Sequence, residues 1–461
     1  MTETNKTLIA DLRRVLTGRV VAPDAEDWDA ERRPWHTLVP QEPVAVVHAA
    51  SVRDIQKVVR AAEWHRLAVS PQPRGHGATS HTADGSILLR LDLLDEITVE
   101  RDVVRIGAGV AWKDLNAALA GTGSTSLPGS NGNVSVVGYT LSGGLSWFSR
   151  AYGQAAHSIQ AIELVDAGGK ARRVTADSDA QLFWALCGGG GDFGIVTAIE
   201  VRLHPAPHIY GGSKIWSFFH VRELVQAFTT VTDAAPDELT LWLTLLRMPD
   251  LDSVPEPLRG RAAVSVSAAY LGDADEAEKL LAPLYAVAEP ELGQFGSLSI
   301  DQIDSISDEP HEPMPITGRA HLLTEFNDEV VDALLKEINR GDTPLAMLQI
   351  RHLGGALLRS TTTDGPSGAI DDPYLLLAAG VVTDPEQTRV IQQALYRVTA
   401  GVILSVSGRV PMTMAGDEPI EHIFAPRQLA RLRDIKDRVD PHRRLRSNYP
   451  VWPRERHPRQ Y

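Results

Sequence analysis

Glycine-rich loops in the first half of the chain constrain its fold more than any other feature. One loop places His76 between two glycines, and two more cover residues 129–132 and 138–144, each after a predicted strand. Glycine allows the backbone to approach a ligand closely and to point successive N–H groups at an anion. One such loop would be interpreted as a tight turn. Three of them close together predict a bound, extended cofactor that carries phosphate groups.

Two well-known nucleotide-binding patterns do not explain these loops. Residues 189–194 have the spacing G-x-G-x-x-G, but they follow a predicted helix and precede a predicted strand, whereas a dinucleotide fingerprint follows a strand and opens a helix. Residues 107–112 have the right context but end in Trp112, where close packing needs a glycine. No glycine run leads into Gly-Lys-Ser or Gly-Lys-Thr. We therefore expect neither a Rossmann domain nor a P-loop.

Charge and cysteine content exclude several classes of protein. The 461 residues carry a net charge of −14, which argues against binding to nucleic acid or to anionic membranes. The single cysteine, Cys187, cannot form an intramolecular disulfide or a cysteine-rich metal centre, and we expect no metal site. No segment reaches the ~20 apolar residues of a membrane span, and Met1–Thr17 predicts an amphipathic helix rather than a signal peptide. We expect a cytoplasmic protein.

The pattern of predicted elements changes at the Pro-Ala-Pro segment 205–207, where we expect a domain boundary. Short strands and helices alternate before it. After it, strands such as Ala263–Tyr270 and Tyr374–Val381 are separated by helices such as Asp328–Asn339, which predicts an antiparallel sheet backed by helices on one face. A last helix is predicted over Pro426–Val439. The predicted fold class is α+β.

His76 is the candidate functional residue of the first glycine loop. A histidine in a loop is usually a solvated or structural residue. Here the flanking Gly75 and Gly77 would let a cofactor reach the imidazole, which is a nucleophile when it is neutral. The residues alone favour neither interpretation over the other.

Four sequence motifs are specific when they are taken together. They are residues 75–77, residues 127–130 with 137–144, residues 182–197, and residues 440–441 with 445–448. With these motifs, the chain resembles flavoproteins of the vanillyl-alcohol oxidase and p-cresol methylhydroxylase superfamily. It is most similar to the branch of berberine-bridge-enzyme-like and 6-hydroxy-nicotine-oxidase-like oxidases. The resemblance covers essentially the whole chain.

The resemblance implies FAD as the cofactor, bonded covalently through His76. Residues 1–205, completed by 425–461, would form the FAD-binding domain, and residues 206–424 a substrate domain whose sheet lies over the flavin. A small-molecule substrate would be oxidised, and molecular oxygen would take the electrons. The residues that the resemblance assigns to FAD are Gln72, Arg74, Gly75, His76, Gly77, Ala78, Gly129, Ser130, Asn133, Val134, Val137, Gly138, Thr140, Gly143, Gly144, Gly194, Ile195, Val196 and Asn448.

Two positions in this resemblance bear on FAD attachment and on oxygen. Some relatives attach FAD a second time through a cysteine, and Val134 stands at that position here, so we expect a single bond through His76. Cys187 lies in another glycine block and is expected to be a packing residue. Val137 falls where relatives control the access of oxygen to the flavin. A valine there resembles the oxidases more than the dehydrogenases.

The catalytic tyrosine of many relatives is missing from this chain. It belongs to a Tyr-x-Asn segment, and Pro411 stands in the corresponding place. Proline cannot accept a proton. Tyr449, which follows Asn448, and Tyr139, in an FAD loop, remain as candidates if neighbouring groups lower their pKa. Ring packing is the expected role of Tyr139, whereas for Tyr449 packing and catalysis are both open.

Alternation along the predicted strand 346–353 adds Gln349 and Arg351 as candidate catalytic residues. Leu348 and Ile350 share one face of this strand. If that face packs on helices, Gln349 and Arg351 point toward the flavin. Arg351 would then bind an acidic substrate or the anion of the reduced flavin. The alternative is a surface arginine on an edge strand.

Two functions are open at this point. The first is an FAD-dependent oxidase that acts on an alcohol, an amine or a natural-product intermediate. The second is a homologue in which FAD is structural or supports a non-oxidative cyclisation or a binding role, and Pro411 favours it. The FAD motifs and Val137 favour the oxidase.

Overall fold

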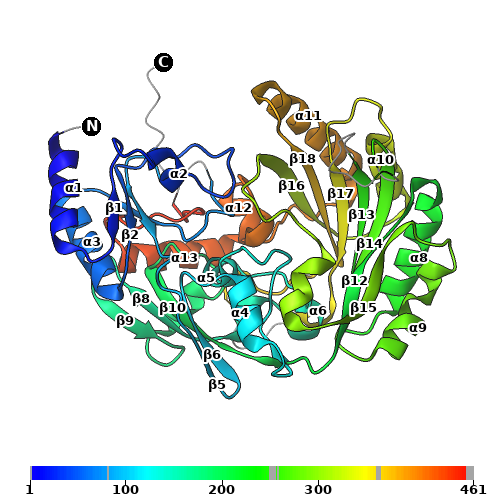
Figure 1. Cartoon of the computed structure of the whole chain (residues 1–461), viewed down its shortest axis with the longest axis horizontal. Helices are drawn as coiled ribbons and strands as arrows, with labels where there is room; N and C mark the ends of the chain where they lie inside the picture. The colour runs from blue at the N-terminus through cyan, green and yellow to red at the C-terminus, as the bar shows by residue number, and fades with distance from the viewer. Residues whose placement is uncertain (1–2, 80–82, 249–255, 257–258, 360–364, 453–461) are drawn as a thin grey trace.

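The computed structural model describes residues 3–79, 83–248, 256, 259–359 and 365–452. Two smaller sheets occupy one half of the molecule, and a larger sheet covered by helices occupies the other (Figure 1). Within the described ranges, no helix is long and apolar enough to cross a membrane.

The first sheet has four strands in the order β1-β2-β4-β3. Strands β2 and β3 both pair with β4 in parallel, whereas β1 pairs with β2 antiparallel. Helices α1 and α3 pack against each other beside this sheet, and Ser51 caps α3 by accepting a hydrogen bond from the backbone N–H of Asp54. The bounds are Arg19–Val21 (β1), Ala45–His48 (β2), Val69–Pro71 (β3), Ile87–Arg90 (β4), Glu3–Val15 (α1), Trp28–Arg32 (α2) and Val52–His65 (α3).

The second sheet has five antiparallel strands in the order β5-β6-β10-β8-β9. Helix α13 packs against α7, so the end of the described chain returns to this half of the molecule. The bounds are Ile97–Glu100 (β5), Val103–Gly107 (β6), Ile159–Val165 (β8), Ala171–Val174 (β9), Ile195–Arg202 (β10), Trp112–Leu119 (α4), Val136–Leu141 (α5), Ser149–Tyr152 (α6), Ala180–Leu186 (α7), Ile420–Ile423 (α12) and Pro426–Val439 (α13).

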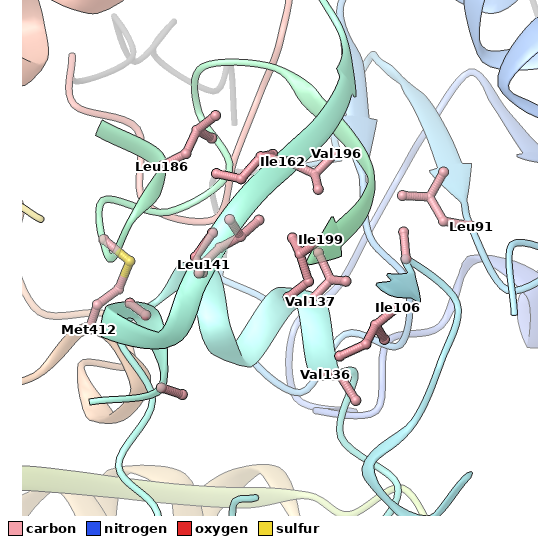
Figure 2. Close-up of a cluster of buried hydrophobic side chains, with 14 of the residues drawn as sticks. Leu91, Ile106, Val136, Val137, Leu141, Ile162, Leu186, Val196, Ile199 and Met412 are labelled. Carbon is pink, nitrogen blue, oxygen red and sulfur yellow. The ribbon is translucent and has the colours of Figure 1, made fainter. Parts of the chain in front are cut away.

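Helix α5 is fixed against the second sheet by an apolar contact. It lies against β6 and β10, and Figure 2 shows Val136 near Ile106 and Val137 near Ile199. Both valines are almost fully buried. This packing places the short helix between the sheet and the cavity described below.

The third sheet has seven antiparallel strands in the order β15-β12-β14-β13-β17-β18-β16. Helices α8 to α11 cover one of its faces (Figure 1), and Leu348 and Ile350 are buried in the core on that side. The arrangement confirms the predicted α+β fold class. The bounds are Ile209–Ser217 (β12), Leu239–Arg247 (β13), Ala262–Tyr270 (β14), Leu292–Leu298 (β15), Ile316–Leu323 (β16), Met347–His352 (β17), Tyr374–Val381 (β18), Val221–Ala234 (α8), Ala274–Tyr285 (α9), Asp328–Ile338 (α10) and Pro385–Val402 (α11).

The segment 205–207 begins with the last residue of a short strand and ends just before the first strand of the large sheet. The short strand β11 (His204–Pro205) pairs with β7 (Ser124–Thr125), and β12 then begins the large sheet at Ile209. The division into an FAD-binding and a substrate domain at this segment stays a prediction.

Candidate functional site

A cavity of about 1270 Å³ lies between the glycine loops of the first half and the uncovered face of the large sheet. The loop 71–77, residues 129–138 and helix α5 form one wall, and strands β12 to β18 contribute to the opposite wall. The segment 305–316 closes part of the rim, where Asn131 donates a hydrogen bond to the backbone oxygen of Pro310 at 2.9 Å. The cavity therefore joins segments from both halves of the molecule.

His76 lines this cavity, and its imidazole is stacked on an indole ring. The ring centroids of His76 and Trp35 are 4.4 Å apart, and the rings are inclined by 15°. Both ring nitrogens of His76 are buried without a hydrogen-bond partner among the described residues. Burial lowers the pKa of His76 to about 3, and the charge of Arg74 adds to this effect. The imidazole is therefore neutral at physiological pH, as a nucleophile must be.

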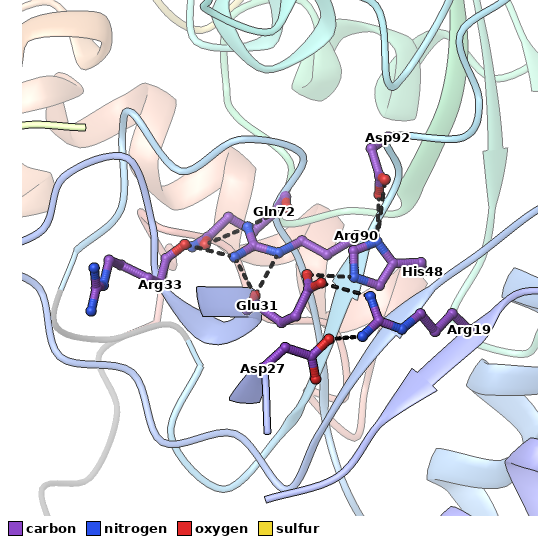
Figure 3. Close-up of polar contacts among 8 residues, drawn as sticks. All are labelled: Arg19, Asp27, Glu31, Arg33, His48, Gln72, Arg90 and Asp92. Carbon is purple, nitrogen blue, oxygen red and sulfur yellow. Dashed lines mark hydrogen bonds and ion pairs between the residues drawn. The ribbon is translucent and has the colours of Figure 1, made fainter. Parts of the chain in front are cut away.

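Arg90 of β4 holds the backbone on both sides of this ring pair. Its guanidinium donates to the backbone oxygen and to Oε1 of Gln72, both at 3.1 Å, and to the backbone oxygens of Glu31 and Arg33, both at 2.9 Å (Figure 3). The loop of His76 and the segment that leads to Trp35 are thus tied to the same buried side chain. Gly75 has φ +83°, and a Cβ there would lie 2.7 Å from Cβ of Pro34.

Tyr139 of α5 is held between two of the predicted cofactor glycines. A Cβ on Gly144 would lie 2.5 Å from the Tyr139 ring, and one on Gly129 would lie 3.0 Å from it. The hydroxyl is buried without a hydrogen-bond partner in the described part of the chain. Burial raises the pKa of Tyr139, although the nearby charge of Arg351 opposes the shift. The tyrosine therefore stays protonated and cannot act as a base near neutral pH.

Gln349 and Arg351 both line the cavity, in agreement with the predicted alternation along β17. Gln349 donates to Oγ1 of Thr244 at 3.0 Å, and Nε of Arg351 donates to Oε1 of Gln349 at 2.7 Å. Arg351 lies over the ring of Trp242, its partner across the β13–β17 pair, at 3.7 Å. Arg351 is 4% exposed, so it is a buried cation and not a surface arginine on an edge strand.

Tyr449 also lines the cavity, but its surroundings differ from those expected. Burial is the largest cause of a raised pKa, and the charge of Asp417 adds to it, whereas a hydrogen bond from the backbone of Gly416 opposes it. The charge of Arg351 lowers the pKa of Tyr139, whereas it is not among the causes that shift the pKa of Tyr449. A lowered pKa was the condition for either tyrosine to act as a base, and this condition is not met, because desolvation outweighs the favourable charges.

A buried lysine fixes the C-terminal segment that carries Asn448. Nζ of Lys436 donates to the backbone oxygens of Asp192 and Leu445 at 2.6 and 3.0 Å, and to Oδ2 of Asp440 at 2.9 Å. Oδ1 of Asp192 accepts in turn from the hydroxyl of Ser447 at 3.2 Å. The network joins the glycine block 189–194 to the end of the described chain, and thereby places Asn448 at the cavity.

Pro411 is not among the residues that line the cavity. It precedes a short 3-10 turn, Met412–Met414, and all three residues of that turn reach the cavity wall. Two methionines and a threonine therefore stand near the place where the resemblance led us to look for a tyrosine. None of them is a strong proton acceptor.

Most of the predicted cofactor residues meet at this cavity. Cys187 is buried in the core and its pKa is raised to about 12 by burial, which agrees with a packing role. No motif or periodic pattern pointed to Trp35, Glu309 or Met414, which also line the cavity. The predicted FAD residues that line it are Gln72, Arg74, Gly75, His76, Gly77, Gly129, Ser130, Val134, Val137, Gly138, Gly194, Val196 and Asn448. Those outside the lining set are Ala78, Asn133, Thr140, Gly143, Gly144 and Ile195.

The donors around the cavity fit FAD. Besides the ring nitrogens of His76, Nε2 of Gln72 and Nε of Arg74 are buried without hydrogen-bond partners among the described residues. These polar groups and the backbone N–H groups of the glycine loops suit a diphosphate, and the lining includes residues as far apart in the sequence as Pro71 and Tyr449. Because unpartnered buried polar groups are costly, a bound polar ligand would stabilise this wall.

Comparisons with known proteins agree with this fit. A family model described as an FAD binding domain matches residues 43–175. (R)-6-hydroxynicotine oxidase of Paenarthrobacter nicotinovorans is 27% identical over 95% of this chain and 97% of its own length. The structure of 6-hydroxy-D-nicotine oxidase from Arthrobacter nicotinovorans has a TM-score of 0.83 at 23% identity, covering 95% of this chain and 98% of that one. Berberine bridge enzyme from Eschscholzia californica has a TM-score of 0.80 at 17% identity, covering 97% and 99%. The chain thus matches an FAD binding domain over residues 43–175, is similar over nearly its full length to a 6-hydroxynicotine oxidase, and has the fold of the berberine-bridge-enzyme-like structures.

Proposed function

We propose that the protein is an FAD-dependent oxidase that holds FAD through one covalent bond to His76, oxidises a small organic metabolite and passes the electrons to molecular oxygen. The observation that carries this proposal is the imidazole of His76, which is neutral, faces the cavity and has two ring nitrogens without a partner in the described part of the chain. FAD, when bound, supplies the acceptor for a hydride from the substrate.

The covalent bond would join a ring nitrogen of His76 to a methyl carbon of the flavin ring. Its formation would break the N–H bond of the imidazole and one C–H bond of the methyl group, and the two protons and two electrons released would go to molecular oxygen to give hydrogen peroxide. Trp35 restricts the rotation of the imidazole, and Arg90 holds the backbone on both sides. A second bond is not expected, because Val134 carries no nucleophile and Cys187 is buried with a raised pKa.

Oxygen as the electron acceptor is supported by Val137. This residue lies on α5, is 3% exposed and contributes to the cavity wall. A small side chain there leaves more room beside the flavin than a leucine would. The non-oxidative alternative is not favoured, because (R)-6-hydroxynicotine oxidase, which matches nearly the full length of this chain, is named as an oxidase.

The uncovered face of the large sheet would receive the substrate. Gln349 and Thr244 present an amide and a hydroxyl, whereas Leu246 and Leu377 present aliphatic groups. We assign this sheet to the substrate domain 206–424, and the glycine loops to the FAD-binding domain 1–205 with 425–461. Tyr139 and Tyr449, both protonated, would act as hydrogen-bond donors rather than bases.

Acid precipitation tests the attachment, and reoxidation tests the acceptor. The precipitated wild-type protein should stay yellow and fluoresce under ultraviolet light, whereas His76→Ala should release its FAD. His208→Ala, a change of an exposed histidine, is the matched control and should keep the colour. After anaerobic reduction, the wild type should reoxidise rapidly in air with formation of hydrogen peroxide. A colourless wild-type pellet would refute the covalent bond, and slow reoxidation would make the protein a dehydrogenase.

A further inference from the structure

Arg351 forms one layer of a rigid stack in the cavity wall. Its guanidinium lies 3.7 Å from the ring centroid of Trp242, and Trp147 is stacked with Trp242 at a centroid distance of 3.7 Å and an angle of 23°. Both indole rings are buried. The plane of the guanidinium is therefore fixed before any ligand binds. Because the side chain is already ordered, binding costs little of its conformational entropy.

Among the described residues, the charge of Arg351 has one ion-pair partner, which lies at a long distance and is partly exposed. Nε donates to Gln349, but the two terminal amino groups donate no hydrogen bond within the described residues. The nearest carboxylate, that of Glu309, is 4.0 Å away and 35% exposed. Burial lowers the pKa of Arg351 to about 10, so the group is still charged at neutral pH. A buried charge in this state is costly unless a ligand pairs with it.

We propose that Arg351 is a carboxylate subsite, and that the substrate is an organic acid. Building on the proposed oxidase function, the acid's carboxylate accepts two parallel hydrogen bonds from the terminal amino groups of Arg351, the geometry in which a guanidinium binds a carboxylate best. The unpartnered hydroxyl of Tyr139, which faces the same charge, supplies a further donor. Met347 and Leu377, farther along the sheet, offer apolar contacts to the body of the acid.

Binding of benzoate and benzamide to the FAD-loaded enzyme tests the subsite. The two probes have the same shape, and only benzoate is an anion. Calorimetric titration should show that the wild type binds benzoate at least about tenfold more tightly than benzamide, a difference of about 1.4 kcal/mol. Quenching of tryptophan fluorescence, with Trp242 in the stack, gives a second readout. Neither readout requires flavin reduction or oxygen.

Three variants assign the preference to Arg351. Arg351→Gln should bind the two probes about equally, and Arg351→Lys should keep part of the preference, because the charge remains and the planar fork is lost. Arg319→Gln is the matched control, since it removes the same charge from the other face of the same sheet, where Arg319 lies over Tyr396 of α11. Arg319→Gln should keep the wild-type preference.

Several results would overturn the subsite. They are equal affinity of the wild type for both probes, an undiminished preference in Arg351→Gln, and the same loss in Arg319→Gln as in Arg351→Gln. If Arg351→Gln does not fold, the subsite is tested by the ratio of benzoate to benzamide affinity in the wild type and in Arg351→Lys. If Arg351→Gln keeps the preference but lowers the reduction potential of the flavin, Arg351 serves the reduced cofactor instead. A colourless acid pellet would refute the covalent bond and slow reoxidation would refute the oxidase proposal, and neither result would change the outcome of the benzoate titration.

Discussion

The imidazole of His76 lies nearly parallel to the indole of Trp35, with 4.4 Å between the ring centroids. Trp35 is itself held by the backbone, because its N–H donates to the carbonyl oxygen of Arg74 at 3.1 Å and its indole Nε1 donates to that of His311 at 3.1 Å. The nucleophile proposed for FAD attachment is thus positioned by a ring that is anchored on both sides of the cavity rim.

Removing this ring should slow the covalent attachment of FAD. In Trp35→Ala the imidazole can rotate away from its position, so we expect attachment to be at least about tenfold slower, as misplacement of a reacting group commonly costs. Trp35→Phe keeps a ring but loses the bond to His311, and should attach FAD at a rate closer to the wild type. The measurement is the flavin that remains in acid-precipitated protein over time after FAD is added to apoprotein. Equal rates in all three proteins would show that the stack does not position His76.

Enlarging Val137 should slow reoxidation of the reduced flavin. Val137→Leu adds a methylene group to a closely packed part of the cavity wall, where even one added carbon displaces neighbouring atoms. We therefore expect oxygen to react with the reduced flavin about tenfold more slowly. Stopped-flow mixing of reduced enzyme with aerated buffer measures this step. Anaerobic reduction by dithionite is the internal control and should be unchanged. A wild-type reoxidation rate in the variant would remove Val137 from the control of oxygen access.

Protonation of His352 should make the protein less stable in acid. Its Nε2 accepts a hydrogen bond from Nη1 of Arg150 at 3.0 Å, and burial lowers its pKa to about 3, with the charge of Arg150 as a second cause. The unfolded chain takes up this proton near pH 6.5, whereas the folded protein does not until about pH 3. The histidine's contribution is therefore present above pH 6.5 and is lost as the pH falls, by about 2 kcal/mol at pH 5.

Urea unfolding at pH 7.5 and pH 5 measures this contribution. His352→Gln offers Arg150 an amide oxygen but does not titrate, so the free energy of unfolding should fall less between the two pH values than in the wild type. His76 and His204 also have lowered pKa values and account for acid sensitivity that remains in the variant. The same pH dependence in both proteins would contradict the assignment to His352.

The sequence predicted the elements whose hydrophobic pattern is regular. The bounds of β18 and α13 agree with the predicted ranges Tyr374–Val381 and Pro426–Val439, and those of β14 and α10 agree to within one residue. Strand β12 was not predicted, because Gly211 and Gly212 interrupt it and resemble a loop. In the fold these glycines are required by close strand packing, since a Cβ on Gly212 would lie 2.1 Å from the backbone oxygen of Gln294. The reason for such a glycine is visible only once the neighbouring strand is known.

In the site, too, the features that depend on local geometry could be predicted from the sequence, and those that depend on tertiary contacts could not. Alternation along β17 was sufficient to direct Gln349 and Arg351 to the cavity, because period-two geometry is local. Trp35 belongs to a segment without periodic pattern, and its contact with His76 arises only when two distant loops meet. The pKa values of the tyrosines could not be predicted either, since they depend on burial, which the sequence does not report.

The tyrosines at the cavity should not take over the proton that a tyrosine removes in many relatives. Burial raises the pKa of both Tyr139 and Tyr449, so neither should act as a general base between pH 6 and pH 9. Each hydroxyl can still donate a hydrogen bond. We expect Tyr139→Phe, next to Arg351, to reduce the rate of anaerobic flavin reduction more than Tyr449→Phe, whose hydroxyl lies beside Asp417 and Gly416.

The pH profile of flavin reduction separates a donor from a base. If the tyrosines are donors, each variant should lower the rate by a constant factor and keep the profile of the wild type. A loss of about tenfold or more together with disappearance of a pKa from the profile would instead identify that tyrosine as the base. This test needs a substrate that reduces the flavin, and the carboxylate subsite at Arg351 directs the search to organic acids. An acid whose oxidised carbon bears an acidic hydroxyl would need no base from the protein, and its reduction rate should follow its own pKa in all three proteins.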